Sequence, residues 1–116
     1  MRLVHERPSA EPSTLVSQVD TADSLVSQAR GLMFRRSLPD EYALAFRFSR
    51  AKHRDVHMVF VFVPLDVIWV VDDVVQRIER LRPWRGFARE EADLIVELPA
   101  GGADEVATGD RLWLAE

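Results

Sequence analysis

A chain of 116 residues, 47% of them apolar, is long enough to form one globular domain with a buried core. A net charge of −4 argues against non-specific binding of nucleic acid by the whole surface, and the lack of cysteine excludes disulfides, thiolate nucleophiles and cysteine-ligated metals. The longest apolar run, residues 59–65, is too short to span a bilayer, and charges and prolines interrupt the first residues where a signal peptide would be apolar. We therefore expect a soluble, cytoplasmic protein.

The first third of the chain reads as an arm followed by a strand and a helix. Residues 5–14 are rich in Pro, Ser and Glu, so we interpret residues 1–14 as an N-terminal arm or loop and residues 15–116 as a single domain. A short strand is expected at residues 15–19. Asp20 or Thr21 suits a helix N-cap, and apolar residues recur at helical spacing from Leu25 to Met33, which predicts one main helix at about residues 21–33.

Strand patterns dominate the rest of the chain. Alternation predicts a strand at residues 42–48, followed by a polar connection at 49–55, and an apolar central strand at 56–63 that ends at Pro64. Residues 74–81 have helical spacing, but the Asp72-Asp73 pair before them favours a two-residue hairpin turn and a returning strand. The other expected elements are strands at 65–71, 93–98 and 111–114, a loop at 82–89 and a short helical turn at 103–107.

These elements predict the fold class. About six or seven strands and one helix, without regular alternation of the two, disfavour a parallel βαβ sheet. We expect an α+β fold that is β-rich, with a mostly antiparallel sheet or partly closed barrel and the helix at about 21–33 packed on it.

Four short motifs follow one another in order along the chain. They are Ala-Arg-Gly-Leu-Met-Phe-Arg at residues 29–35 with Leu38-Pro39, His57-Met58 leading to Pro64-Leu65-Asp66, Glu-Leu-Pro-Ala-Gly at residues 97–101, and Gly109-Asp110. Together they resemble the family known as domain of unknown function 192, over roughly residues 15–114. The resemblance implies a small β-rich α+β domain of bacteria and archaea whose biochemical role is not established.

The chain departs from the pattern of that family at one place. Many members carry a Trp-Met-Lys-Asn-Thr run just before Pro-Leu-Asp. Met58 matches the methionine, but Val59 and Phe60 stand at the lysine and asparagine positions. Any role of those two polar groups is therefore not carried over to this chain.

Polar residues in or beside the expected strands are the candidates for a site. A charge inside an apolar run is costly unless it is paired or reaches water, so His57 and Asp66 are either structural ties or parts of a site. The structural interpretation is backbone or turn hydrogen bonding, which also suits Asp110 after Gly109. The functional interpretation is a shallow ligand-binding pocket lined by Arg35, His57, Asp66 and Glu97. No spacing of histidines and carboxylates matches a metal motif, so we expect no metal and no cofactor.

A second candidate surface runs from Arg77 to Arg89. It holds five arginines with Trp84 and Phe87 between them, a composition that suits single-stranded nucleic acid. Acidic residues interrupt and follow this stretch, so a solvated loop in which Trp84 caps the core is the structural interpretation, and we do not expect a nucleic-acid partner.

The sequence favours a binding or accessory module for a small anionic ligand or a protein partner, without membrane association. An alternative is an enzyme of the hydrolase or transferase type that uses His57 with a carboxylate. That alternative requires His57 to meet Asp66 or Glu97 in an open cleft. A second alternative is RNA binding through the stretch from Arg77 to Arg89. The sequence leaves open whether any reaction is catalysed.

Overall fold

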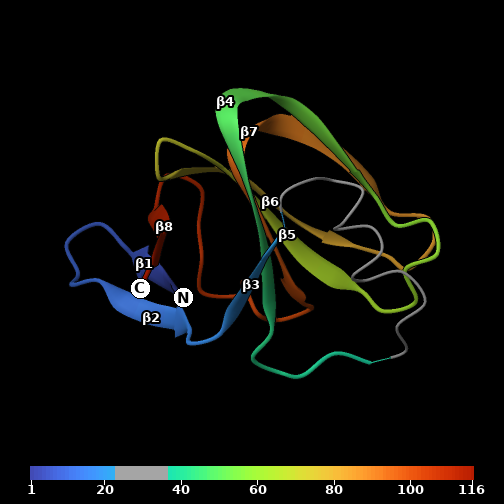
Figure 1. The fold of residues 1–116 in the computed structure, drawn as a ribbon, viewed down its shortest axis with the longest axis horizontal. Coiled ribbons are helices and arrows are strands. Elements are labelled where there is room, and N and C mark those ends of the chain that lie inside the picture. The colour runs from blue at the N-terminus through green and yellow to red at the C-terminus, as the bar shows by residue number, and fades with distance from the viewer. Residues whose placement is uncertain (23–36) are drawn as a thin grey trace.

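The computed structural model of the protein describes residues 1–22 and 37–116, which form eight β-strands (Figure 1). The strands are β1 (Arg2–Glu6), β2 (Ser13–Val16), β3 (Val19–Ala22), β4 (Ala43–His57), β5 (Leu65–Val71), β6 (Val74–Leu81), β7 (Phe87–Pro99) and β8 (Arg111–Ala115). All eight belong to one sheet, in the order β2-β1-β8-β6-β5-β7-β4-β3. In Figure 1, β1, β2 and β8 lie on one side of the molecule beside both termini, and the long strands β4 and β7 curve over the other side.

The fold class predicted from the sequence is wrong. The described residues are all-β and contain no helix, and they form eight strands where six or seven were expected. Six of the seven strand pairings are antiparallel, but β3 pairs with β4 in parallel, so the sheet is mixed. β2 and β3 are its two edges, and the sheet is not closed into a barrel.

The helix predicted at about residues 21–33 fails at its start. Asp20 and Thr21 pair with Leu44 and Ala45 of β4, so pairing in the sheet replaces the N-cap that their side chains suggested. The remainder of the predicted helix, residues 23–33, lies outside the described residues.

β4 is longer than the sequence indicated. It runs from Ala43 to His57 and includes residues 49–55, which we had interpreted as a polar connection. This part of β4 pairs with residues of β7 that have no register with β5, so the two strands extend beyond β5, and the side chains of residues 49–55 are largely exposed. A bulge between Arg47 and Lys52 shifts the register there. Polar composition therefore marked an exposed ribbon and not a loop.

The central strand predicted at residues 56–63 is also wrong. β4 ends at His57, and residues 58–64 form a turn and a loop. The loop is apolar for two different reasons. Met58 and Val61 are buried in the core, whereas Val59 and Phe60 are more than 40% exposed.

The β5–β6 hairpin confirms the prediction for residues 65–81. Both strands have the expected bounds, and Asp72 and Asp73 form the two-residue turn between them. Their φ angles are 49° and 65°, the backbone of a turn whose twist matches that of the flanking strands. The turn returns the chain antiparallel to β5, which overrides the helical spacing of residues 74–81.

The centre of the sheet, β5 and β7, is buried on both faces. Alternation along β5 sends Leu65, Val67 and Trp69 to one face and Asp66, Ile68 and Val70 to the other. We call these the Trp69 face and the Ile68 face. The Ile68 face packs against apolar residues of β1, β2 and β8, and the Trp69 face packs with Phe46, Met58 and Ile95.

The N-terminal residues contribute to this core. Within residues 1–14, β1 pairs antiparallel with both β2 and β8, and Leu3 is fully buried. β8 joins the other half of the sheet through one registered pair, Val74 with Arg111. In the part of the chain that the structure describes, no helix is long and apolar enough to cross a membrane.

Candidate functional site

Asp66 is a buried carboxylate at the start of β5, only 3% exposed. Its two oxygens accept hydrogen bonds of 2.8 and 3.2 Å from Nε and Nη2 of Arg80, the residue opposite it on β6. Oδ2 also accepts the backbone N–H groups of Gly101 at 2.9 Å and Ala103 at 3.1 Å. Arg80 donates a further bond of 2.7 Å to Asp104. One carboxylate thus joins the start of β5, the end of β6 and the turn after β7.

These contacts set the charge state of Asp66. Burial disfavours the ionised carboxylate, but the hydrogen bonds from Arg80, Ala103 and Gly101 outweigh burial and hold the pKa of Asp66 below its usual range. The hydrogen bonds to Asp66 and Asp104 raise the pKa of Arg80. An ionised carboxylate offers about four acceptor positions, and four donors of the chain occupy them. This geometry supports the structural interpretation of Asp66.

His57 forms no hydrogen bond or ion pair with Asp66, one of the carboxylates with which it was grouped. It is the exposed last residue of β4 and pairs with Phe87 at the start of β7. Asp66 pairs with Leu98, eleven positions further along β7, and its hydrogen bonds come from Arg80, Gly101 and Ala103 and not from His57. Within the described residues, the convergence that the enzyme alternative requires is not seen.

Glu97 and Asp66 are neighbours along the sheet but point to opposite sides. Glu97 is 4% exposed and shares the Trp69 face with its register partners Leu44 and Val67. Asp66 lies on the Ile68 face. Arg35, the fourth residue predicted for the pocket, lies outside the described residues.

The stretch from Arg77 to Arg89 is largely engaged within the protein. Arg77 donates to Glu79 at 3.0 Å and to the carbonyl oxygen of Arg89 at 2.9 Å. Arg80 is held by Asp66, and Arg89 lies 3.4 Å from Asp55. The other two arginines, Arg82 and Arg85, form no ion pair with a described residue and lie on either side of Trp84. The cations that remain open to a partner are therefore beside this tryptophan.

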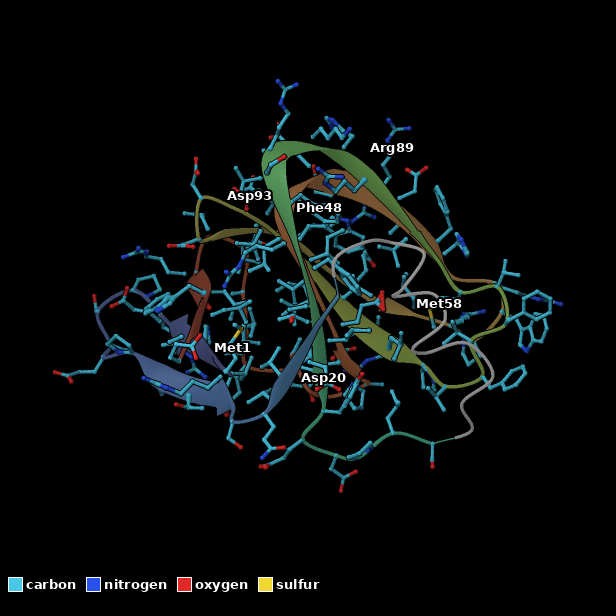
Figure 2. All side chains as sticks on the ribbon, in the orientation of Figure 1. Met1, Asp20, Phe48, Met58, Arg89 and Asp93 are labelled. Carbon is cyan, nitrogen blue, oxygen red and sulfur yellow. The ribbon has the colours of Figure 1, made fainter. Side chains whose placement is uncertain are left out.

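Trp84 belongs to a group of apolar side chains, four exposed and one, Phe62, half-buried, that we call the aromatic end: Val59, Phe60, Phe62, Trp84 and Phe87. Their exposed fractions reach 47% for Trp84 and 62% for Phe87. The Trp84 ring lies 5.0 Å from that of Phe60, edge to face, and 5.4 Å from that of Phe62. Met58, labelled in Figure 2, is the buried residue at the base of this group. Large apolar side chains gathered at the surface carry more information than single ones, because they mark interaction sites.

Backbone hydrogen bonds fix the two loops of the aromatic end to each other. The backbone N–H of Trp84 donates to the carbonyl oxygens of both Met58 and Val61, each at 3.1 Å. The backbone N–H of Met58 donates to the carbonyl oxygen of Gly86 at 3.0 Å. A Cβ atom at Gly86 would come within 2.8 Å of Cγ of Met58 and 2.7 Å of Cβ of Leu81. Only glycine fits this position, so the loops form a closely packed platform.

The platform holds two of its aromatic residues in a costly backbone conformation. Phe60 and Trp84 have φ angles of 62° and 68°. The left-handed region costs a bulky residue about 1–2 kcal/mol, and such strain clusters at binding and catalytic sites. Both strained residues are more than 40% exposed. Among the described residues, the aromatic end is the best candidate for a functional site.

A second buried polar contact, which the sequence analysis missed, joins His5 to Asp110. Nε2 of His5 lies 2.7 Å from Oδ2 of Asp110, and the same oxygen accepts the N–H of Ala107 at 3.0 Å. Both side chains are at least 93% buried. Burial disfavours ionised Asp110, but the bonds from His5 and Ala107 lower the pKa of its carboxyl. Asp110 caps its own turn, as predicted, and also holds β1 through His5.

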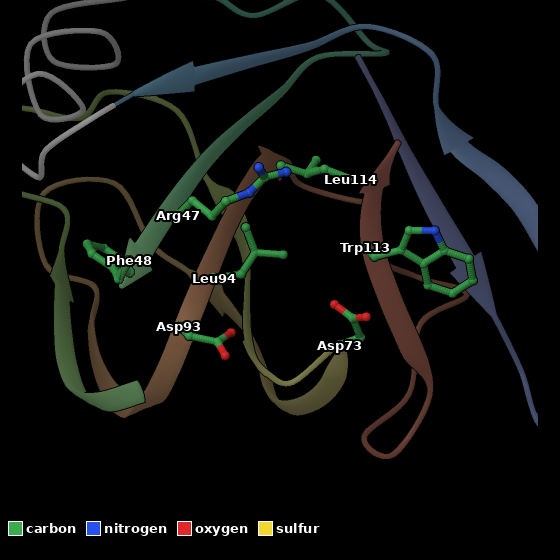
Figure 3. Close-up of a pocket in the computed structure, with 7 residues that line it drawn as sticks. All are labelled: Arg47, Phe48, Asp73, Asp93, Leu94, Trp113 and Leu114. Carbon is green, nitrogen blue, oxygen red and sulfur yellow. The ribbon is translucent and has the colours of Figure 1, made fainter. Parts of the chain in front are cut away.

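A cavity of about 340 Å³ lies between β7 and β8 (Figure 3). Its lining comes from β4, β7, β8 and the β5–β6 turn, and consists of Arg47, Phe48, Asp73, Asp93, Leu94, Trp113 and Leu114. In Figure 3, Arg47 lies toward one end, Asp73 and Asp93 lie toward the other, and Leu94 is between them. This cavity contains none of the residues that the sequence analysis proposed for a pocket.

A family model, DUF192, matches residues 7–114, nearly the whole chain. The chain belongs to the DUF192 family. This confirms the resemblance seen in the motifs. The description of DUF192, "Uncharacterized ACR", names no activity, ligand or partner.

Two crystal structures share the fold of this DUF192 chain. One is a Sinorhizobium meliloti protein described as a candidate transcription regulator, with a TM-score of 0.83 and 25% identity over 97% of this chain and 91% of that chain. The other is a protein of unknown function from Novosphingobium aromaticivorans, with a TM-score of 0.80 and 24% identity over 98% of this chain and 84% of that chain. No curated protein matches the chain significantly.

One signal in the sequence pointed to the aromatic end before the structure did. Val59 and Phe60 replace the lysine and asparagine found in many DUF192 members. The apolar pattern predicted a central strand over these residues, but both are exposed in a loop. An apolar residue that replaces a polar one indicates burial only where the segment is known to be a strand or helix.

Proposed function

We propose that this DUF192 protein is a binding module and that the aromatic end is its docking surface for a protein partner. The observation that carries the proposal is that Phe60 and Trp84 touch each other, are more than 40% exposed and have strained backbones. A chain retains such strain where the surrounding structure over-determines it, most often at sites of function. Tryptophan on a rigid platform is also a frequent energetic centre of protein interfaces.

The charge of the two loops favours an acidic partner. Residues 58–64 and 81–87 contain two arginines and no aspartate or glutamate, whereas the whole chain carries −4. Arg82 and Arg85 flank Trp84 and form no ion pair with a described residue. A partner segment with carboxylates around an apolar anchor would complement both the rings and the guanidinium groups.

Nucleic acid is a competing partner because the Sinorhizobium meliloti neighbour is described as a candidate transcription regulator. The arginines of this region favour nucleic acid less than they favour an acidic protein partner. Arg77, Arg80 and Arg89 bind groups of the protein itself, which leaves two cations for a phosphate backbone. Two phosphate contacts give weak binding with a shallow dependence on salt.

The test compares three kinds of partner on the full-length chain. A protein captured from host extract is identified, purified and titrated against the parent and against Trp84→Asn, because asparagine tolerates the left-handed backbone while removing the ring. We expect affinity to fall at least about tenfold, with no change for Val74→Ser, an exposed apolar residue at the opposite end of β6.

Two parallel titrations complete this test. Vesicles of anionic phospholipid and single-stranded oligonucleotides are titrated against the same variants. Binding of either that requires Trp84, in place of a protein, would refute the assignment to a protein partner. Equal affinity of the parent and Trp84→Asn for the purified partner would refute the aromatic end as the docking surface.

A further inference from the structure

The cavity between β7 and β8 arises where β8 diverges from the sheet. β8 is registered with β6 only at Val74 and Arg111, and beyond that pair a space of about 340 Å³ opens. This volume lies at the lower end of the range of about 300–1,000 Å³ that is usual for sites of small ligands. The cavity shares no residue with the aromatic end, so it is a separate site and does not depend on the proposed function.

The charged groups of the cavity are separated in space. Toward one end is the guanidinium of Arg47, which is exposed and forms no ion pair with a described residue. Toward the other end are the carboxylates of Asp73 and Asp93, as Figure 3 shows. Leu94 supplies apolar surface between them, and Leu114 lies beside Arg47. Two carboxylates and one guanidinium give the lining a net charge of −1.

The two carboxylates are held in place, and one of them remains open. Oδ2 of Asp93 accepts the N–H of Asp72 at 3.0 Å, which docks the β5–β6 turn onto β7. Asp73 follows in that turn with a φ of 65°, where glycine is the usual residue. Its nearest cation is Arg111, at 3.8 Å, and its side chain is 51% exposed. The turn therefore fixes Asp73 while leaving its oxygens accessible to a ligand.

We infer that this cavity binds a basic amino acid. The α-carboxylate would lie against Arg47, the side-chain cation against Asp73 and Asp93, and the aliphatic chain against Leu94. The α-ammonium, bonded to the same carbon as the α-carboxylate, would stay at the Arg47 end and face solvent. A basic amino acid has a net charge of +1 and neutralises the −1 of the lining. A neutral amino acid brings no side-chain cation to Asp73 and Asp93, and a diamine leaves Arg47 without an anion, so both bind less well.

The test is a titration of ¹⁵N-labelled full-length protein followed by NMR. The probes are L-lysine and L-arginine, with L-norleucine and 1,5-diaminopentane as controls that each lack one charged group. We expect saturable shifts of the amides of Asp73, Leu94 and Leu114 with the basic amino acids, and affinities weaker by about tenfold or more for both controls.

Two variants and a matched control locate the binding site. Asp73→Asn keeps a residue that tolerates positive φ, and Arg47→Gln changes an exposed side chain, so both should fold. Each should weaken L-lysine binding at least about fivefold, whereas Arg50→Gln, exposed on β4 outside the cavity, should not. The inference is overturned if millimolar L-lysine and L-arginine give no saturable shift, if the shifts centre on Trp84, or if Asp73→Asn binds as tightly as the parent.

Discussion

Asp66→Ala should unfold the protein at lower denaturant concentration than any single surface substitution. The change removes a carboxylate that accepts four hydrogen bonds and leaves the N–H groups of Gly101 and Ala103 without their partner. The turn at residues 100–104 then loses its connection to β5. Because Ala103 is 4% exposed, water cannot readily replace the lost acceptor.

The expected loss is about 1–3 kcal/mol of the free energy of unfolding. The buried N–H of Ala103, left without a partner, accounts for this cost, whereas Gly101 is exposed and its N–H can return to water. Arg80 adds little, because its side chain is 54% exposed and its guanidinium can return to water. In a domain of this size, such a loss lowers the melting temperature by roughly 10 °C.

Urea unfolding at pH 7, followed by circular dichroism, measures this loss. Asp55→Ala is the matched control, since its ion pair with Arg89 is exposed and should be worth less than about 1 kcal/mol. If Asp66→Ala unfolds within about 0.5 kcal/mol of the parent, a range typical of surface substitutions, the assignment of Asp66 as a structural tie is wrong.

The same carboxyl predicts the direction of the pH dependence. The pKa of Asp66 is lower in the folded state than its ordinary value of 3.8. Its contribution to stability is therefore complete above that value and is lost as the pH falls through the folded-state pKa. The parent should lose stability on acidification below about pH 4, and Asp66→Ala should lose less over the same interval. If the two proteins lose the same stability below about pH 4, the pKa of Asp66 is not lowered in the folded state.

Three further substitutions test other parts of the structure. His5→Ala leaves buried Asp110 with the N–H of Ala107 as its remaining hydrogen bond, and should cost about 1–3 kcal/mol in urea unfolding; a loss below about 0.5 kcal/mol would show that the pair does not hold β1. Gly86→Ala forces a Cβ to within 2.8 Å of Met58 and should cost about 1–3 kcal/mol, whereas parent-like stability would mean that the loops are not closely packed. Asp73→Gly relieves a φ of 65° and should raise the free energy of unfolding by up to about 1 kcal/mol while weakening L-lysine binding; a drop in stability would contradict the turn geometry.

The elements that could be predicted from the sequence are those with a complete local signal. The β5–β6 hairpin was found because β-branched strands flank a pair of residues suited to a tight turn. The fold class failed because N-cap chemistry at Asp20 and Thr21 yielded to parallel pairing with β4, a contact between residues more than 20 positions apart. The sequence analysis divided β4 in two because the middle of the strand is polar, although these residues pair with β7 while their side chains face solvent.

The candidate site could be predicted even less, because it depends on contacts between residues that are distant in sequence. His57 and Asp66 are nine residues apart in sequence, but β7 lies between their strands, and register along it separates them by eleven residues. The contact of His5 with Asp110 joins residues 105 positions apart, so no local sequence pattern predicts it. The strained φ angles of Phe60 and Trp84 arise from the packing of two loops, which no local pattern encodes.

The most direct test of the aromatic end is the dissociation constant of the purified partner measured for the parent and for Trp84→Asn at one salt concentration. A rigid, strained tryptophan at the centre of the docking surface predicts at least a tenfold increase, about 1.4 kcal/mol, with an unchanged melting temperature. An unchanged dissociation constant, with Trp84→Asn folded as the parent is, would contradict the claim that this surface binds the partner.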